Sequence, residues 1–564
     1  MSSSVFSTRP WLSSYASKVP HDIAPTTQTL TDMLDASVQG FGAHVALDFF
    51  GATTTYAELG LQVSRAAQGL SELGVVAGDR VALVLPNCPQ HVVAFYAVLR
   101  LGAVVVEHNP LYTADELRHQ FEDHGATVAI VWDKLADTVV GFADQLGLRS
   151  IVGVDMSAAM PLSMRVKLRL PVARAREARN AITRGSLPDG VIAWRSIVSA
   201  APLPDRHPRP ALDDIAALQY TSGTTGRAKG AVLTHRNLRA NAAQGRAWVP
   251  GLTEGGEVVY AVLPMFHAYG LTLCLTFALS IGARLVLFPR FDLDLTLDAM
   301  KRKPATFLPA VPPIYERLAL GAAEKNVSLS GIRFAISGAM SLPVRIVELW
   351  ESSTGGLLVE GYGMTESSPV AIGNPIGPSR RPGTIGVPFP STEIRVVDPE
   401  NPEVDRGFDE EGELMLRGPQ VFQGYWNRAA ETAVTLLPGG WLRTGDIVRV
   451  TPDGFVTVID RIKELIITGG FNVAPTEVEE VLRGHPSVAD VAVVGMPDDD
   501  GGEVVTAAIV LASDAQLDIA ALRAFAKKSL AAYKVPKSFE VVAELPRSLI
   551  GKVLRREVRE KLAR

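Results

Sequence analysis

Residues 219–235, QYTSGTTGRAKGAVLTH, are the most informative stretch of this 564-residue chain. The centre of this stretch is rich in Gly, Ser and Thr, which expose backbone N–H groups, supply hydroxyl donors and tolerate the dihedral angles of a concave turn. Lys229 adds a positive charge, and the preceding run 215–220 is apolar and typical of a strand. The following run 231–238 is not a Gly/Ser linker. The pattern therefore favours a loop that wraps phosphate oxygens over a surface turn.

This loop differs from a Walker A motif, in which Gly-Lys is followed by a Ser or Thr that binds magnesium. Ala228 precedes Lys229 and Gly230 follows it, so a metal ligand must come from elsewhere in the chain. The loop resembles the signature of the adenylate-forming superfamily, which includes acyl-CoA synthetases, luciferases and peptide-synthetase adenylation domains. The resemblance implies that the loop holds the β- and γ-phosphates of ATP. The residues concerned are Thr221, Ser222, Gly223, Thr224, Thr225, Gly226 and Lys229.

The composition describes a globular chain with ample core, since 47% of the residues are hydrophobic and 20% are charged. A net charge of −5 argues against a general nucleic-acid-binding protein, and we expect no nucleic-acid partner. The N-terminus lacks the apolar core of a signal peptide, and only Cys88 and Cys274 are present, which fits a reducing compartment. The longest apolar stretch, 271–288, is interrupted by Gly282 and Arg284 and predicts a buried helix followed by a strand. We therefore predict a cytoplasmic protein.

The pattern of helix-like and strand-like segments changes along the chain. Helical patterns alternate with short apolar runs over residues 28–110, 257–289 and 304–338, which indicates α/β layers with parallel strands. Residues 382–459 contain short β-rich runs between Gly, Pro and Asp turns, which indicates a small antiparallel subdomain. Helix and strand patterns alternate again from residue 476 onward.

These patterns predict an α/β fold with a large N-terminal lobe of several subdomains, one of them small and β-rich. A smaller, mobile α+β domain is expected to follow. With the superfamily resemblance, the expected division is an N-terminal adenylation domain over 1–459, a hinge over 460–463 and a C-terminal mobile domain over 464–564.

The motif GYGMTESSP at 361–369 resembles the second core motif of the same superfamily. The resemblance implies that Tyr362 stacks on adenine, that Thr365 bonds the α-phosphate and that Glu366 binds Mg²⁺. The chemistry is consistent, because Mg²⁺ is a hard ion that takes one or two carboxylates together with phosphate oxygens. Glu366 would thus supply the ligand that the loop after Lys229 lacks.

A third motif, SGAMSLP at 337–343, follows a strand-like run. Its small residues Gly338 and Ala339 would let a flat ring approach the backbone, and the resemblance implies adenine as that ring. From the residues alone, a helix start capped by Ser337 or Ser341 is equally compatible with the pattern.

Two motifs flank the change in composition near residue 460. In GGWLRTGDIV, 439–448, the resemblance makes Asp446 the ribose ligand, and a carboxylate can accept from both ribose hydroxyls. In DRIKELIITGGFNVAPTEVE, 460–479, it makes Arg461 a second ribose or phosphate contact and puts Lys463 at the hinge.

The resemblance also covers the coenzyme A and adenylation steps. Gly469 and Gly470 offer an open backbone that a pantetheine arm can approach. In PRSLIGKVLRREV, 546–558, Lys552 corresponds to the lysine that neutralises the α-phosphate and the substrate carboxylate during adenylation. Ile467 is a departure, since some relatives carry at this position a lysine implicated in the second half-reaction.

LPMFHAYG, 263–270, matches the segment that begins the acyl pocket in the superfamily, and His267 occupies its gate position. Amino-acid-activating domains usually carry an Asp here to bind the substrate ammonium group. Its absence argues against an amino-acid substrate.

Residues 160–187 differ from the rest of the chain, with seven cations against one acid, Glu177, and interleaved aliphatic side chains. A solvated surface helix is one interpretation, and an interfacial segment that contacts anionic lipid is the other. The alternation over 164–170 predicts a strand period there, and an amphipathic helix is expected only over 171–183. A lipid contact would place the protein peripherally at the inner face of the membrane.

Together these features predict an ATP-dependent fatty acid–CoA ligase that forms an acyl-AMP intermediate and uses ATP, Mg²⁺ and coenzyme A. The basic segment favours a medium- or long-chain fatty acid, while other carboxylic acids stay open as substrates. The alternatives are an aryl-acid (coumarate-type) CoA ligase and an acyl-AMP ligase that loads a carrier protein. An ATP-binding sensor without turnover and a luciferase-like oxygenase are further hypotheses.

Overall fold

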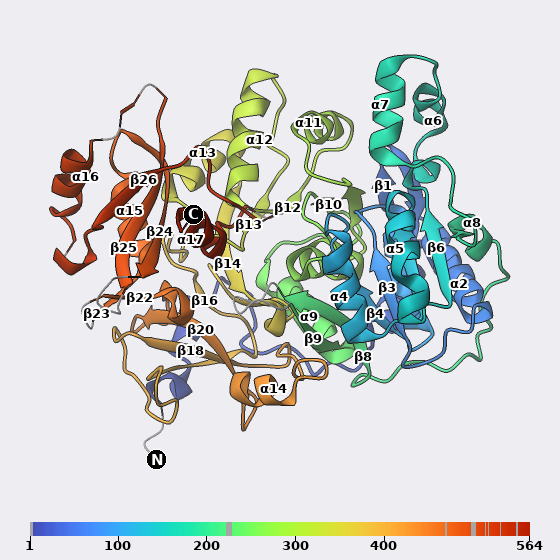
Figure 1. Cartoon of the computed structure of the whole chain (residues 1–564). Coiled ribbons are helices and arrows are strands. Elements are labelled where there is room, and N and C mark those ends of the chain that lie inside the picture. Colours follow the sequence, from blue (N-terminus) through green and yellow to red (C-terminus); the bar gives the residue numbers. More distant parts are fainter. Residues whose placement is uncertain are drawn as a thin grey trace.

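The computed structural model describes residues 4–221, 228–468, 471–497, 503–513, 515–516, 518–530, 532–548 and 551–563. Two large, mainly parallel sheets form the body of the chain (Figure 1). The first has seven strands in the order β7 (Ile192–Ala193), β6 (Ser150–Val154), β5 (Val128–Trp132), β3 (Arg80–Val84), β4 (Val104–Glu107), β8 (Ile215–Thr221) and β9 (Lys229–Thr234). All neighbours in it are parallel except β8 and β9, which form an antiparallel hairpin.

The second sheet has nine strands and is parallel in its centre, with antiparallel strands at both edges. Its order is β16 (Val387–Pro388), β15 (Val370–Gly373), β14 (Leu357–Gly363), β13 (Phe334–Ser337), β12 (Phe307–Ala310), β10 (Val258–Ala261), β11 (Arg284–Leu287), β1 (Val45–Phe49) and β2 (Ala52–Thr55).

The alternation of side chains along the strands divides the core between the two faces of the seven-stranded sheet. Val81 and Leu83 of β3 join the large core that both sheets share, whereas Ala82 and Val84 join a second cluster on the opposite face. Helices α1 (Leu30–Phe41), α2 (Tyr56–Glu72) and α3 (Pro89–Arg100) contribute to the shared core, and α4 (Ala114–His124) and α5 (Ala136–Ala143) to the second cluster.

Helix α9 (His235–Trp248) begins where the Thr234 side chain accepts a hydrogen bond from the Asn237 N–H, and α11 (Leu293–Arg302) begins where Asp292 accepts one from the Leu295 N–H. The lobe also contains α8 (Trp194–Ile197), α10 (Phe277–Ser280), α12 (Pro312–Glu324), α13 (Val344–Thr354) and α14 (Ala429–Thr435). The apolar stretch 271–288 is a buried π-helix (Gly270–Thr276), then α10, then β11, which confirms the predicted helix followed by a strand.

The predicted β-rich subdomain is an antiparallel sheet, and the expectation of such a sheet within 382–459 is confirmed. Its strands are β17 (Glu393–Val397), β18 (Gly412–Arg417), β20 (Trp441–Val450), β19 (Leu436–Leu437) and β21 (Val456–Arg461). Helix α15 (Pro475–Arg483) follows the hairpin of β22 (Ile466–Thr468) and β23 (Phe471–Val473) and opens a smaller α+β unit. That unit continues with β24 (Val488–Pro497), β25 (Glu503–Leu511), α16 (Ile519–Ala526), β26 (Ser538–Val541) and α17 (Arg555–Leu562).

The large lobe and the C-terminal unit have separate apolar cores. The buried residues of the main cluster end at Val456, and the two clusters of the C-terminal unit contain only residues from Ile466 onward. This division confirms the predicted fold class of a large α/β lobe followed by a smaller α+β domain.

The basic segment forms a pair of short helices, α6 (Leu162–Leu168) and α7 (Ala173–Ile182), so the strand period expected over 164–170 is wrong. Met164 and Leu168 lie one helical turn apart and both pack against the main core, which favours the helix over the alternating pattern. The helix expected over 171–183 is confirmed as α7. Among the described residues, no helix combines the length and the hydropathy needed to cross a bilayer.

Candidate active site

The β8–β9 hairpin carries the two ends of the predicted phosphate loop. Thr221 and Lys229 are directly opposite each other at the tips of the two strands. The predicted loop residues Ser222, Gly223, Thr224, Thr225 and Gly226 lie outside the described part of the chain. The Lys229 Nζ lies 5.0 Å from the centre of the Tyr425 ring, so its charge is held beside an aromatic face.

Thr365 and Glu366 lie on a single turn, Thr365–Ser367, that follows the end of β14. The buried Glu366 accepts a hydrogen bond at Oε1 from the Tyr425 hydroxyl, at 2.5 Å. Burial raises the pKa of the Glu366 carboxyl, while Tyr425 and the charges of Arg461 and Lys229 oppose that shift. The turn therefore places the Glu366 carboxylate beside the Tyr425 hydroxyl and near two cations, Arg461 and Lys229.

This arrangement fits the predicted magnesium ligand. Mg²⁺ is usually held by one or two carboxylates together with substrate phosphates rather than by an all-protein cage. Among the described residues there is no group of three or more His, Cys, Asp and Glu that could hold a metal ion. Glu366, near the predicted phosphate loop, is therefore the residue that would hold the ion jointly with phosphate oxygens.

Asp446 and Arg461 are paired across adjacent strands β20 and β21, with 2.8 Å between Arg461 Nε and Asp446 Oδ1. The Asp446 charge is the largest cause of a raised pKa at Arg461. The Tyr362 hydroxyl donates to the other carboxylate oxygen of Asp446. The predicted adenine-stacking and ribose-binding residues thus form one hydrogen-bonded group.

Lys552 reaches this group from the C-terminal domain. Burial lowers the pKa of Lys552, and Arg461 lowers it further, whereas Glu464 and Asp446 raise it. Gly551 beside it has a φ of +81°, and a Cβ there would lie 3.3 Å from the sulfur of Met340 in the 337–343 loop. The close approach holds the Lys552 segment against the 337–343 loop, and the charges of Asp446 and Arg461 act on Lys552 there.

A cavity of about 440 Å³, open to solvent, joins the predicted adenine and acyl sites. Five predicted site residues are in its wall: His267, Gly338, Ala339, Tyr362 and Thr365.

His267 and the 338–339 turn give this cavity its shape. The His267 ring accepts a 3.3 Å hydrogen bond at Nδ1 from the Tyr269 N–H, and burial lowers its pKa to about 4, so the ring is neutral near pH 7. A Cβ at Gly338 would lie 3.1 Å from the Tyr269 ring. Ala339 adopts a φ of +66°, which a non-glycine residue holds only under strain, and such strain is concentrated at functional sites.

Of the remaining predicted residues, Gly469 and Gly470 lie outside the described part of the chain, and of Lys463 only the backbone is described. The Lys463 backbone lies in a short turn, Ile462–Glu464, directly after β21. Ile467 pairs with Asn472 in the β22–β23 hairpin and is exposed.

Sequence reasoning missed Tyr425, which contacts both Lys229 and Glu366. Its segment runs beside β9: Trp426 N–H donates to the Gly230 carbonyl at 2.8 Å, and Val232 N–H donates to the Gly424 carbonyl at 2.9 Å. An aromatic after a glycine in a loop carries no chemical signature by itself, so only the fold reveals this contact.

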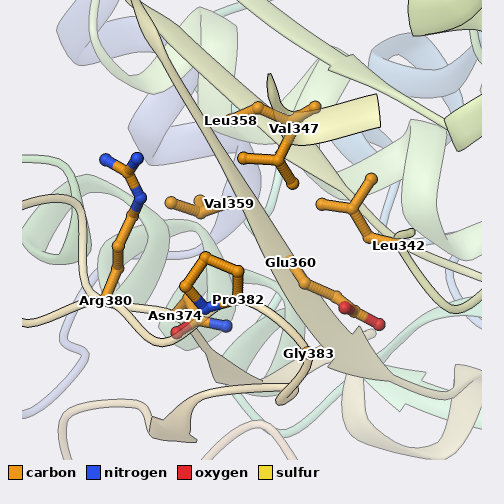
Figure 2. Close-up of a pocket in the computed structure, with 9 residues that line it drawn as sticks. All are labelled: Leu342, Val347, Leu358, Val359, Glu360, Asn374, Arg380, Pro382 and Gly383. Atoms are coloured by element: carbon orange, nitrogen blue, oxygen red, sulfur yellow. The ribbon is translucent and has the colours of Figure 1, made fainter. Parts of the chain in front are cut away.

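A second, smaller hollow lies beside β14 (Figure 2). It extends from the start of α13 to the 380–383 loop. Glu360 points its carboxyl toward Leu342 in this hollow, while Arg380 forms a 2.5 Å ion pair with Glu351 instead. Burial raises the pKa of Glu360 to about 8. Glu360 therefore carries its proton at pH 7, and this carboxyl was also missed at the sequence level.

Comparison with known proteins gives consistent matches over nearly the whole chain. The AMP-binding enzyme family matches residues 34–426, and the C-terminal domain of AMP-binding enzymes matches residues 477–552. A long-chain-fatty-acid–CoA ligase of Bacillus subtilis is 38% identical over 562 residues, covering 98% of both chains. A 4-coumarate–CoA ligase of rice is 36% identical, covering 91% of this chain and 88% of the relative.

The solved structures agree. The ATP-bound crystal structure of MatB from Rhodopseudomonas palustris superposes with a TM-score of 0.82 at 30% identity, covering 95% of this chain and 99% of that one.

The contact between Tyr425 and Glu366 gives a first prediction. Tyr425→Phe keeps the ring beside Lys229 and removes the hydroxyl that orients the carboxylate. Binding of Mn²⁺, used as a paramagnetic probe ion in the presence of ATP, should weaken roughly 10-fold, because hydrogen bonds to charged groups contribute about 1.5–3 kcal/mol. Electron paramagnetic resonance would measure free Mn²⁺.

Tyr220→Phe is the matched control, since Tyr220 lies on β8 of the hairpin that carries Lys229, and its hydroxyl donates to Asp123 of α4 at 2.8 Å rather than to Glu366. This variant should bind Mn²⁺ normally, and Glu366→Gln should lose more affinity than Tyr425→Phe. Unchanged Mn²⁺ binding by Tyr425→Phe would show that the tyrosine does not orient the carboxylate.

The raised pKa of Glu360, about 8, predicts a dependence of stability on pH. Between the unfolded pKa near 4.3 and pH 8 the folded state holds a proton that the unfolded state releases, so stability falls as pH rises through this range. The free energy of unfolding should fall by about 3–5 kcal/mol in total over this pH range. Glu360→Gln should remove this slope, and denaturant unfolding at pH 5 and pH 9 would measure it.

The exposed Glu400 provides a control, because Glu400→Gln should leave the pH slope of the wild type intact. Parallel curves for wild type and Glu360→Gln would contradict a protonated Glu360 in the native state.

Proposed function

The chain belongs to the AMP-binding enzyme family, and from that membership we propose that it is an ATP-dependent fatty acid–CoA ligase that releases AMP and pyrophosphate. The observation that carries the proposal is the approach of the C-terminal domain to the large lobe, where a Cβ at Gly551 would lie 3.3 Å from Met340 and Lys552 lies within the electrostatic influence of Asp446 and Arg461. A cation that the C-terminal domain brings close to residues of the large lobe suits a reaction in which two anions must approach each other.

In the first half-reaction the substrate carboxylate attacks the α-phosphate of ATP, an acyl–phosphate bond forms and pyrophosphate leaves. The nucleophile is already an anion and the leaving group needs no proton, so no general base is required. Lys552 and Thr365 would stabilise the charge that gathers on the α-phosphate. Lys229 and the loop from Thr221 to Gly226 would hold the β- and γ-phosphates.

Glu366 would hold Mg²⁺ together with phosphate oxygens, and the ion would supply charge neutralisation at the phosphates. Tyr362 would stack on the adenine, and Asp446 and Arg461 would bind the ribose. Gly338 and Ala339 would form the backbone wall against which the base lies.

In the second half-reaction the thiolate of coenzyme A attacks the acyl carbon, and AMP leaves. We propose that residues 464–564 rotate about the hinge 460–463, at Lys463, relative to residues 1–459. The rotation would withdraw Lys552 and bring Gly469 and Gly470 toward the pantetheine arm. Separate apolar cores on the two sides of this segment support the proposal, because a rotation need not disrupt either core.

For the substrate we propose a medium- or long-chain fatty acid, with His267 as a neutral gate residue between the nucleotide and the acyl chain. The near-complete match to the Bacillus subtilis ligase supports the aliphatic acid. The rice 4-coumarate ligase keeps the aryl acid as the alternative. The proposed location is the cytoplasm, with peripheral contact at the inner face of the membrane through residues 160–187.

The decisive experiment is ATP–pyrophosphate exchange with a panel of aliphatic and aromatic acids, followed by consumption of coenzyme A. We expect exchange to be fastest with fatty acids and a stoichiometric acyl-CoA product. Faster exchange with coumarate-type acids would favour the aryl ligase. Exchange without use of coenzyme A would favour transfer to a carrier protein, and no exchange with any acid would favour a binding protein.

Lys552→Ala separates the two half-reactions. Acyl-AMP formation should fall by ~10²–10³-fold, as for the loss of one preorganised stabilising group. Thioester formation from supplied acyl-AMP should stay close to normal, and single-turnover measurements would follow each step. Lys527→Ala, on the exposed end of α16, is the control and should affect neither step. Equal loss in both half-reactions would contradict a specific function of Lys552 in adenylation.

A further inference from the structure

Helix α9 carries a row of buried amide side chains that the proposed chemistry does not use. Asn237, Asn241 and Gln244 recur at intervals of four and three residues, so they lie on one face of the helix. All three are buried. A buried amide is costly unless its hydrogen bonds are satisfied, so the partners of this row show which parts of the chain it holds.

Asn237 uses its whole amide group. Its Oδ1 accepts hydrogen bonds from the Thr234 N–H at 3.0 Å and from the Thr234 hydroxyl at 2.8 Å, which fixes the start of α9. Its Nδ2 donates to the carbonyls of Pro419 at 2.9 Å and Val421 at 2.8 Å. Two donors and two acceptor positions are the full capacity of an amide. Asn237 therefore joins the segment 419–421 to the helix.

Asn241 holds a second segment. Its Nδ2 donates to the Val370 carbonyl at 2.7 Å, and its Oδ1 accepts from the Val370 N–H at 3.1 Å. One side chain thus binds both backbone groups of one residue, as a neighbouring strand would. Its Nδ2 also donates to Oε1 of Gln244 at 3.0 Å. Val370 is the first residue of β15, which follows the turn that carries Thr365 and Glu366.

The two segments that α9 holds are the ones that bring Glu366 and Tyr425 together. The Phe422 N–H donates to the Glu366 carbonyl at 2.9 Å, and the Ser368 hydroxyl donates to the Gln420 carbonyl at 2.8 Å. Tyr425, further along the same segment, donates to the Glu366 carboxylate. The backbone around Glu366 and the backbone before Tyr425 are therefore bonded to each other and, through the amide row, to one helix.

Chain order adds Lys229 to the same helix. Strand β9 begins with Lys229 and ends at Thr234, and α9 begins at the next residue. The first two turns of α9 therefore fix three parts of the candidate site relative to one another. They are the strand of Lys229, the turn of Glu366 and the segment of Tyr425.

We propose that Asn237 and Asn241 are positioning residues for the metal ion and the phosphates, because they hold Glu366, Tyr425 and Lys229 in one fixed arrangement. Neither amide is in the wall of the cavity, and each binds backbone groups instead. The inference rests on the proposed function only for the identity of the ligand, which is ATP with Mg²⁺. Loss of either amide should weaken the part of ATP binding that depends on the metal ion.

The test is isothermal titration calorimetry of the full chain with ATP, once with excess Mg²⁺ and once with EDTA. The ratio of the two dissociation constants measures what the ion contributes to binding. Asn241→Ala should reduce this ratio about 10-fold, because it removes both hydrogen bonds to the Val370 backbone and frees the Glu366 turn. ATP affinity in EDTA should change little, since the residues proposed to bind adenine and ribose lie on other segments.

Asn237→Asp is a second variant, designed to keep the start of α9. It retains the oxygen that accepts from Thr234, and a carboxylate in the first turn of a helix is favourable. Both amide donors to Pro419 and Val421 are lost, so the Tyr425 segment loses its attachment to the helix. We expect the ratio to fall about 10-fold here too.

Asn374→Ala is the matched control. Asn374 is also buried, and its side chain also bonds backbone groups as donor and acceptor, with the Thr384 carbonyl at 2.6 Å and the Arg381 N–H at 2.8 Å. Neither partner belongs to the segments that carry Glu366 and Tyr425. This control should lose thermal stability as Asn241→Ala does and should keep the wild-type ratio.

A wild-type ratio in both Asn241→Ala and Asn237→Asp would overturn the proposal. So would an equal loss in Asn374→Ala, because the effect would then be general destabilisation. These outcomes differ from a failure of the proposed function, which would appear as a wild-type protein without pyrophosphate exchange with any acid. A wild-type protein whose ATP affinity gains nothing from Mg²⁺ would exclude Glu366 as the metal ligand and would overturn this inference with it.

Discussion

The carboxyl ends of the parallel strands in the nine-stranded sheet are the constraint on which the site depends. Strand β13 ends at Ser337, and the next residues are the Gly338–Ala339 turn. Strand β14 ends at Gly363, just before Thr365 and Glu366. Because parallel strands all end at the same edge, loops far apart in sequence meet there, as is usual for ligand sites of α/β sheets. The β8–β9 hairpin and the C-terminal domain add Lys229 and Lys552 from outside this sheet.

The charges at this edge partly neutralise one another before any ligand binds. Glu366 and Asp446 are buried carboxylates, and an isolated buried charge is costly. Arg461 contributes to both environments, through its ion pair with Asp446 and through its effect on the pKa of Glu366. A bound polyphosphate would neutralise the remaining positive charge of Lys229 and Lys552. Burial lowers the pKa of Lys552 because it disfavours the charged form, and a nearby anion would offset that cost.

Sequence patterns predicted the parts of the fold that depend on local chemistry. Alternating apolar runs located the α/β layers, and the turn-rich 382–459 region located the antiparallel sheet. The motifs also brought Tyr362 and Asp446 to one site, where their side chains form a hydrogen bond. The contacts of Tyr425 and the buried state of Glu360 were not predictable, because both arise from strands and loops that meet only in the folded chain. The α6 helix was missed since its alternating pattern places apolar residues on two faces, one against the core and one in water.

Positive and negative charges are unevenly distributed along the chain. The whole chain carries a net charge of −5, although residues 160–187 hold seven cations and one acid. The rest of the chain is therefore distinctly acidic, so an anionic membrane would attract residues 160–187 and repel the rest. The two forces would act together and would favour one orientation of the protein on such a surface. A fatty acid leaves the bilayer at its surface, so an enzyme held there in one orientation would present the same face to each substrate molecule.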